Sequence, residues 1–161
     1  MQEAEPQDLP EVEALVKLAY AEFQDFFPEP AWSAWMDNIA KVVYSETGLI
    51  LLAVESGKIM GVVKFYPNAA ESKLGQWPPG TASMRILAVH PESRGHGLGR
   101  RLVQECINRA RSLKIPEMYL YTGTFMKTAR HLYESFGFQR IPEYDKDPGP
   151  IAYRLDLSPQ T

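Results

Sequence analysis

The residue types most suited to binding a ligand are concentrated between positions 94 and 100. This segment reads Arg94-Gly95-His96-Gly97-Leu98-Gly99-Arg100 and lies between an apolar, strand-like run and a strongly patterned helix. Glycine lets a ligand approach the backbone closely. The start of a helix offers N–H groups and the positive end of the helix dipole, which favour an anion such as phosphate. The segment therefore predicts a phosphate-binding corner, with Arg94 and Arg100 adding positive charge suited to phosphate geometry.

The spacing of the glycines excludes two other phosphate-binding motifs. A P-loop would end in Gly-Lys-Ser/Thr, and a dinucleotide fingerprint would be followed by an acidic residue in a second βαβ unit. The pattern present is Arg-x-x-Gly-x-Gly, formed by Arg94, Gly97 and Gly99. It resembles the signature of the GNAT acetyltransferase superfamily, in which this loop holds the pyrophosphate of acetyl-coenzyme A. The alternative is a tight strand–helix turn that binds no ligand.

Two further stretches carry the same resemblance, which covers nearly the whole chain. Residues 132–138 read Leu-Tyr-Glu-Ser-Phe-Gly-Phe, similar to the family's Leu-Tyr-x-x-x-Gly-Phe segment near the end of the fold. Asp8-Leu9-Pro10-x-Val12 is a weaker N-terminal similarity, in which Asp8 is predicted to cap a helix.

Apolar periodicity predicts the elements that position these motifs. Helices are expected in the region of residues 9–19, at 32–39, at 97–113 and at 126–136. Strands are expected at residues 2–5, 48–54, 59–66, 81–89, 118–122, 138–141 and 151–157. This order resembles the GNAT fold, which implies a single α/β domain over residues 1–161 with a mixed, largely antiparallel sheet of about six to seven strands and four flanking helices.

The resemblance assigns the cofactor to this framework. The strand at 85–89 would pair its backbone with the pantetheine arm, and the neighbouring strand at 118–122 would splay away from it. Backbone N–H groups around residues 95–100 would hold the pyrophosphate. The cofactor-binding residues expected on this basis are Leu87, Ala88, Val89, Arg94, Gly95, His96, Gly97, Leu98, Gly99, Arg100, Thr124 and Met126.

Amine acetylation requires few catalytic groups. A base must remove a proton from the ammonium, a donor such as the Val89 N–H could stabilise the oxyanion, and the departing thiolate needs a proton. In the family a tyrosine often protonates the thiolate, and Tyr133 occupies its place. The alternative for Tyr133 is a packing role. Because it lies about 100° around the helix from Leu132, it is expected beside the apolar stripe formed by Ala129, Leu132 and Phe136.

The sequence departs from the family pattern at two places. Many members carry an asparagine where this chain has Met126, so Thr124 is the nearest polar substitute. Many also place a glutamate on the strand before the loop, whereas residues 81–86 contain no carboxylate. The general base therefore stays open between Glu22, Asp25, His131 and a water chain.

Composition narrows the classes of partner. The net charge of −3 gives no sign of nucleic-acid or anionic-membrane binding, and no apolar run approaches the roughly 20 residues of a membrane span. The lone Cys106 falls on an apolar helix stripe, where a core position is expected, and it fits a reducing, cytoplasmic compartment. Cys and His spacing predicts no metal site. The resemblance is compatible with a homodimer.

Two functions from different classes follow. The first is an acetyl-CoA-dependent N-acetyltransferase that transfers acetyl to a primary amine by direct attack, with a small cationic amine favoured over a protein acceptor. Aromatic residues between positions 20 and 35 would then form either one wall of the acceptor pocket or the packing of two helices. The second is a non-catalytic coenzyme A-binding sensor or interaction module, suggested by the missing strand glutamate and by Met126.

Overall fold

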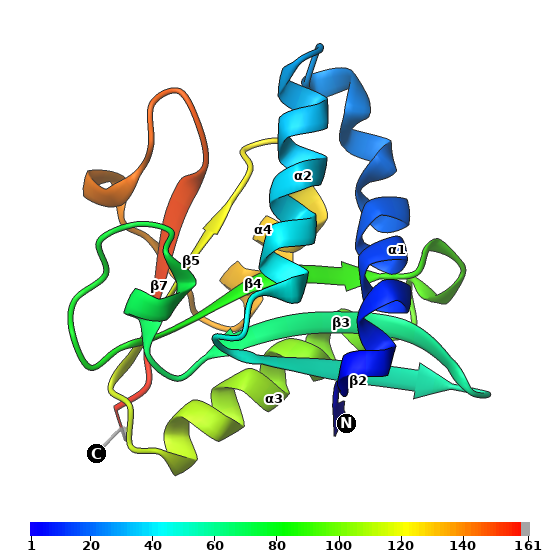
Figure 1. Cartoon of the computed structure of the whole chain (residues 1–161). Helices are drawn as coiled ribbons and strands as arrows, with labels where there is room; N and C mark the ends of the chain where they lie inside the picture. The colour runs from blue at the N-terminus through cyan, green and yellow to red at the C-terminus, as the bar shows by residue number, and fades with distance from the viewer. Residues whose placement is uncertain (159–161) are drawn as a thin grey trace. The chain divides into compact units, whose positions relative to one another are not determined.

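The computed structural model describes residues 1–158 of the 161-residue chain (Figure 1). The predicted order of helices and strands is confirmed. The four α-helices are α1 (Leu9–Tyr20), α2 (Ala31–Tyr44), α3 (Leu98–Ser112) and α4 (Lys127–Ser135). The strands are β1 (Gln2–Glu3), β2 (Leu49–Glu55), β3 (Lys58–Tyr66), β4 (Ala82–Val89), β5 (Glu117–Thr122), β6 (Gln139–Arg140) and β7 (Ile151–Asp156). They form one seven-stranded, mixed sheet in the order β1-β2-β3-β4-β5-β7-β6.

The described chain divides into two compact units. Residues 1–64 and 86–103 form the first unit, and residues 65–85 and 104–158 form the second. The predicted single domain spans both units, and its last three residues lie outside the described part. None of the helices among residues 1–158 is long and apolar enough to span a membrane.

In the first unit, α1 and α2 lie side by side and pack on β2 and β3 (Figure 1). The buried face of α1 is the predicted one, consisting of Val12, Leu15, Val16 and Ala19. The predicted capping role of Asp8 for α1 is wrong. Its carboxylate instead accepts a hydrogen bond from the Glu5 N–H at 2.8 Å and closes the preceding 3₁₀ turn, Pro6–Asp8.

A buried lysine joins α2 to β3. Lys64 is 1% exposed, and its Nζ donates to the Val42 and Ser45 carbonyl oxygens at 2.6 and 2.9 Å. These carbonyls lie at the C-terminal end of α2, where a helix leaves its last C=O groups without intrahelical partners and where its dipole favours a cation. Helix α2 continues to Tyr44, five residues beyond its predicted end.

In the second unit, β5 pairs in parallel with the start of β4 and antiparallel with β7. The register matches Ala82 with Met118 and Ser83 with Tyr119, and β7 pairs with β5 along its whole length. Residues 67–80, predicted to be loop, contain a 3₁₀ turn at Ala69–Ser72 and the buried Trp77, whose ring stacks on Tyr119 at a centroid distance of 5.0 Å. The connection is therefore packed onto the sheet.

Helix α3 is the element that follows the glycine-rich loop. Most of its predicted apolar stripe is buried: Leu98, Leu102, Val103, Cys106, Ile107 and Ala110 are each at most 2% exposed. Leu113, predicted beside this stripe, is 58% exposed because the helix ends at Ser112. Burial raises the pKa of the Cys106 thiol strongly, so this cysteine is a core residue.

Candidate active site

Strand β4 changes conformation immediately before the predicted cofactor segment. Ile86 lies in its middle with φ +54°, a left-handed conformation that is a genuine outlier for a β-branched residue. Such a residue costs on the order of 1–3 kcal/mol and persists only where its surroundings impose it. This kink re-aims the backbone of residues 87–89, and nothing in the sequence signalled it.

The predicted pantetheine-binding residues belong to the first unit. Leu87 and Val89 are half-buried, whereas Ala88 between them is buried. The Tyr20 hydroxyl, at the end of α1, donates to the Leu87 carbonyl oxygen at 2.8 Å. Helix α1 therefore reaches a backbone group of the predicted cofactor segment, a contact that sequence reasoning missed.

The glycine-rich loop has the geometry of an anion site. Gly95 and Gly97 have φ values of +83° and +81°, and a Cβ added to either would meet no atom within 4 Å. The space next to this backbone is therefore open. The loop leads into α3, whose first helical bond runs from the Arg101 N–H to the Gly97 oxygen at 3.0 Å. Since the first N–H groups of a helix have no intrahelical acceptor, these residues fit a pyrophosphate.

A close packing contact positions the start of α3. A Cβ at Gly61 of β3 would lie only 2.9 Å from Leu102 Cδ1, so glycine is needed there for the helix to approach the strand. Among the predicted loop residues, 94–97 and Arg100 are exposed and Gly99 is half-buried, whereas Leu98 is buried and anchors the helix.

Arg94 contacts the end of α1 and the 3₁₀ segment that follows, η2 (Ala21–Phe26). Its guanidinium forms an ion pair with the Glu22 carboxylate and donates to the Ala19 carbonyl oxygen at 3.0 Å. The pair is exposed, with 41% of the Arg94 side chain and 48% of the Glu22 side chain accessible. Glu22, a candidate base, therefore lies beside the predicted phosphate loop.

The second unit holds the other predicted residues. Met126 stands at the N-terminus of α4, where the Thr122 hydroxyl donates to its sulfur at 3.4 Å. Thr124 is exposed, and its carbonyl oxygen accepts a hydrogen bond from Arg130 at 3.1 Å. The side chain of Met126 thus contacts a strand hydroxyl in place of the asparagine contact that the resemblance would place there.

Tyr133 occupies a different position from the one predicted. It was expected beside the buried stripe of α4, but it is the residue of this helix that is buried, with 6% exposure. Its ring lies 5.7 Å from that of Phe138 and 6.4 Å from that of Tyr153, measured between centroids. The predicted stripe residues Ala129, Leu132 and Phe136 are only half-buried. Tyr133 therefore packs as a core residue, whatever its hydroxyl contributes to chemistry.

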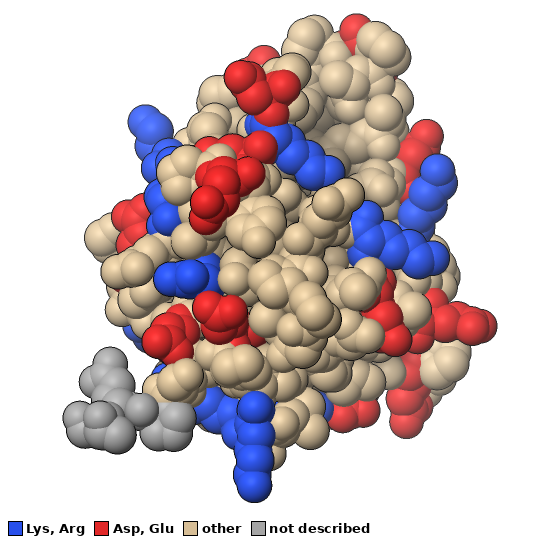
Figure 2. Space-filling model, turned by 90° about the vertical axis from the view of Figure 1, so that its left-hand side faces the viewer, with Lys and Arg blue, Asp and Glu red and all other residues tan. Residues whose placement is uncertain are grey.

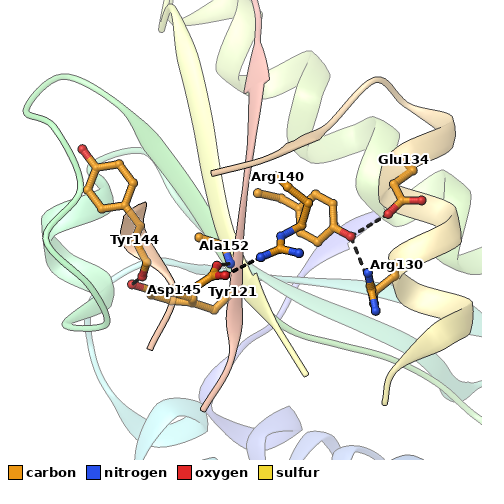
Figure 3. Close-up of polar contacts among 8 residues, drawn as sticks. Tyr121, Arg130, Glu134, Arg140, Tyr144, Asp145 and Ala152 are labelled. Atoms are coloured by element: carbon orange, nitrogen blue, oxygen red, sulfur yellow. Dashed lines mark hydrogen bonds and ion pairs between the residues drawn. The ribbon is translucent and has the colours of Figure 1, made fainter. Parts of the chain in front are cut away.

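A polar cluster next to Tyr133 had no signal in the sequence (Figure 3). The Tyr153 hydroxyl donates to Glu134 Oε2 at 2.6 Å and accepts from Arg130 Nε at 3.2 Å. Burial and the hydrogen bond to Glu134 raise the pKa of Tyr153. The hydrogen bond to Tyr153 raises the pKa of Arg130. The Tyr153 hydroxyl therefore stays protonated at neutral pH.

Most of the chain matches a known protein family. A family model described as the acetyltransferase (GNAT) family matches residues 12–138, which is most of the chain. The chain belongs to the GNAT acetyltransferase family. Its predicted fold and its predicted activity, acetyl-CoA-dependent N-acetylation, are both confirmed by this membership and by the similarities that follow.

One curated relative is similar to this GNAT enzyme in sequence, and two solved structures are similar to it in fold. An uncharacterized N-acetyltransferase of Schizosaccharomyces pombe is 32% identical over 159 residues, covering 95% of this chain and 91% of the relative. The PaiA N-acetyltransferase from Thermoplasma acidophilum, solved in complex with coenzyme A, has a TM-score of 0.74 at 14% identity and 96% coverage of both chains. A GNAT acetyltransferase from Brucella melitensis, solved with acetyl-CoA, has a TM-score of 0.63 at 20% identity, covering 99% of this chain and 88% of that one.

The remaining candidates for a GNAT general base differ in their surroundings. Glu22, Asp25 and His131 are all exposed, and Glu22 is in addition ion-paired with Arg94 of the predicted cofactor loop. Among residues 1–158, no group of three or more His, Cys, Asp or Glu side chains could hold a metal ion.

The face drawn in Figure 2 shows Lys and Arg side chains interspersed with Asp and Glu, so the described residues there form no continuous basic surface.

Proposed function

We propose that this GNAT enzyme acetylates a small cationic amine, and that residues 1–161 act as one catalytic domain in the cytoplasm. The family match runs across both compact units, which supports a single functional domain. The lone, buried Cys106 is consistent with a reducing compartment.

The observation that carries the choice of acceptor is the contact between the η2 region and the cofactor segments. Tyr20 donates to Leu87, and Glu22 pairs with Arg94, so this region borders the acetyl-CoA site. Four carboxylates and no Lys or Arg lie between Lys17 and Lys41. Negative charge attracts a cationic amine and repels an acidic one.

Half-buried aromatic rings accompany these carboxylates. Tyr20 stacks on Trp35 at a centroid distance of 5.3 Å, and Phe27 lies 4.6 Å from Trp35. Apolar walls with a few convergent polar groups are typical of small-molecule sites. Aromatic faces also favour cations. The surroundings of Glu22 therefore suit a small organic amine.

Bound acetyl-CoA supplies an activated acetyl group as a thioester. The loop backbone at residues 95–100 and Arg94 would hold the diphosphate, and the Val89 N–H would donate to the thioester carbonyl oxygen. The amine nitrogen would bond to the acetyl carbon as the carbon–sulfur bond breaks. The proton lost by the amine would pass to the general base, which stays open between Glu22, Asp25, His131 and a water chain. The thiolate would take its proton from the Tyr133 hydroxyl, which water would then reprotonate. No acetylated enzyme would form in this reaction.

An amine screen tests the proposed function. Release of the coenzyme A thiol is measured with acetyl-CoA and a panel of diamines, monoamines, amino acids and short peptides. Sustained release above hydrolysis is expected with cationic small amines, without ping-pong kinetics. Preference for acidic acceptors or for peptides would contradict the acceptor class, and a trapped acetyl-enzyme on the productive path would contradict direct attack.

The role of Tyr133 is tested by Tyr133→Phe, which keeps the buried ring and removes the hydroxyl. If the hydroxyl protonates the thiolate, kcat falls on the order of 100-fold, and the KM for acetyl-CoA changes little. Because the ring packing is retained, the melting temperature should stay close to that of the wild type. Full activity would assign Tyr133 to packing alone.

A further inference from the structure

The Tyr153 hydroxyl links β7 to two residues of α4, Arg130 and Glu134, which are labelled in Figure 3. Tyr153 is fully buried, and its hydroxyl contacts Glu134 at 2.6 Å and Arg130 at 3.2 Å. Arg130 and Glu134 are four residues apart, so they lie one above the other on the same face of the helix. One hydroxyl, acting as both donor and acceptor, therefore fixes a full turn of α4.

The same contacts extend to both sides of the tyrosine. Arg130 also donates through Nη1 to the Thr124 carbonyl oxygen at 3.1 Å, which ties the β5–α4 connection to the cluster. On the other side, the Arg140 guanidinium lies 5.9 Å from the centre of the Tyr153 ring and forms an ion pair with Asp145. Asp145 in turn accepts from the Ala152 N–H at 2.7 Å. The Tyr153 ring is thus also contacted from β6, through Arg140.

Tyr133 precedes Glu134 in α4, and its ring packs against Tyr153. Rotation of α4 about its axis would move the Tyr133 hydroxyl, because that atom lies far from the axis. Contacts at Arg130 and Glu134 oppose this rotation. Displacement of a reacting group by about 1 Å can cost on the order of 100-fold in rate, so this restraint bears directly on catalysis.

We propose that Tyr153 is a positioning residue for acetyl transfer: its hydroxyl sets the rotation of α4 and thereby the place of the Tyr133 hydroxyl. This inference rests on the proposed role of Tyr133. Tyr153 acts through Tyr133, and Arg130 and Glu134 transmit the restraint. A hydroxyl that only stabilised the fold would lower the melting temperature and leave the turnover of folded enzyme unchanged.

The test combines Tyr153→Phe with Tyr133→Phe. Thiol release from acetyl-CoA is measured with water as the acceptor in every case and, in addition, with the best amine of the screen. Tyr153→Phe should lower kcat about tenfold and change the KM for acetyl-CoA less than about twofold. In the Tyr133→Phe background the same substitution should have no further effect on kcat, because residues that act through one group are non-additive.

Glu134→Gln provides a second variant at an exposed position, where folding is not at risk. Its amide oxygen still accepts from Tyr153 but carries no charge, so a smaller decrease in kcat is expected, again absent in the Tyr133→Phe background. Tyr119→Phe is the matched control. Tyr119 is also buried, and its hydroxyl donates to Glu117 at 3.3 Å in the same unit, so the loss of this hydroxyl should leave kcat unchanged.

The outcomes distinguish failure of the positioning role of Tyr153 from failure of the proposed function. A kcat of Tyr153→Phe equal to that of the wild type, or a decrease that multiplies that of Tyr133→Phe, overturns the positioning role. Full activity of Tyr133→Phe removes the proposed acid; any loss in Tyr153→Phe would then come from another cause and would also overturn the inference. Absence of all thiol release by the wild type contradicts the proposed function itself.

Discussion

At the glycine-rich loop the groups proposed to face a ligand belong to exposed backbone, whereas at the α4–β7 contact a buried side-chain hydroxyl contacts the helix. Gly95 and Gly97 adopt left-handed conformations next to open space. Tyr153 is fully buried and hydrogen-bonded on both sides. The first region is proposed to bind its ligand with backbone groups that every residue possesses, whereas the contact in the second region depends on one oxygen atom of one side chain.

This difference decides what a substitution can do in each region. A side chain added in the loop fills the space needed by an anion, so the effect falls on affinity for acetyl-CoA. A hydroxyl removed from the α4–β7 contact leaves cofactor binding groups in place, so the effect falls on turnover. Loop variants and contact variants should therefore separate KM effects from kcat effects.

Among the variants that compare these two regions by affinity for acetyl-CoA, the largest expected effect is that of Gly97→Ala. An alanine at φ +81° costs about 1–2 kcal/mol of folding free energy, and its methyl group enters the space proposed for the diphosphate. Affinity for acetyl-CoA should fall more than about tenfold, equivalent to about 1.4 kcal/mol. Isothermal titration with acetyl-CoA measures the affinity, and urea unfolding measures the folding cost.

Gly57→Ala is the matched control for the backbone cost. Gly57 lies in the β2–β3 turn with φ +79°, and a Cβ there also meets no atom within 4 Å. It should destabilise the fold as much as Gly97→Ala and leave acetyl-CoA affinity unchanged. Equal losses of affinity in both variants would mean that strain, and not occupation of the ligand space, accounts for the effect.

A smaller effect is expected at the Arg94–Glu22 pair. Because Glu22 and a diphosphate compete for the same guanidinium, Glu22→Gln should lower the KM for acetyl-CoA about two- to fivefold, the range of an exposed ion pair. Arg94→Ala should raise that KM about tenfold, since hydrogen bonds to charged groups contribute about 1.5–3 kcal/mol. Steady-state kinetics at varied acetyl-CoA measure both. A higher KM for Glu22→Gln would show that Glu22 orients Arg94 and does not compete for it.

The sequence predicted the fold and the loop well because their signals are local. Glycines at positive φ and an apolar stripe with the helical period, such as Leu98, Leu102 and Cys106, are imposed by the backbone and by burial. Element boundaries were less accurate: α2 continues to Tyr44, and β6 is limited to Gln139–Arg140. The ends of these elements depend on tertiary contacts, such as Lys64 with the last carbonyls of α2.

The contacts that organise the rest of the site join residues far apart in the chain. Tyr20 reaches Leu87 across 67 positions, and Tyr153 reaches Glu134 across 19. A tyrosine at either position resembles any other packing residue in the sequence. The residue type at position 86 even predicts the wrong conformation, because a β-branched residue such as Ile86 is expected to stay extended in a strand. Helical spacing also predicted that Tyr133 lies beside the core. In the structure it lies in the core, packed against Phe138 and Tyr153.

The smallest expected effect concerns alkaline pH and the Tyr153 hydroxyl. Burial and the hydrogen bond to Glu134 raise its pKa above the ordinary value of 10.0, which the unfolded chain retains. Above pH 10 the unfolded state therefore loses this proton while the folded state keeps it, so the free energy of unfolding falls as pH rises towards the folded-state pKa. The stabilisation is complete below the unfolded-state value.

Tyr153→Phe removes this one contribution and leaves those of the other buried tyrosines. Urea unfolding between pH 8 and pH 11 gives the free energy of unfolding of the wild type and the variant as a function of pH. The two curves should be parallel below about pH 10. Above it the wild-type curve should fall more steeply, and the difference in slope should correspond to at most about one bound proton. Glycine-loop variants such as Gly97→Ala should follow the wild-type slope, because they carry no titrating group. Curves that stay parallel over the whole range would mean that the Tyr153 hydroxyl is hydrated in the folded protein. In exposure to water, the α4–β7 contact would then be closer to the glycine-rich loop than its geometry indicates.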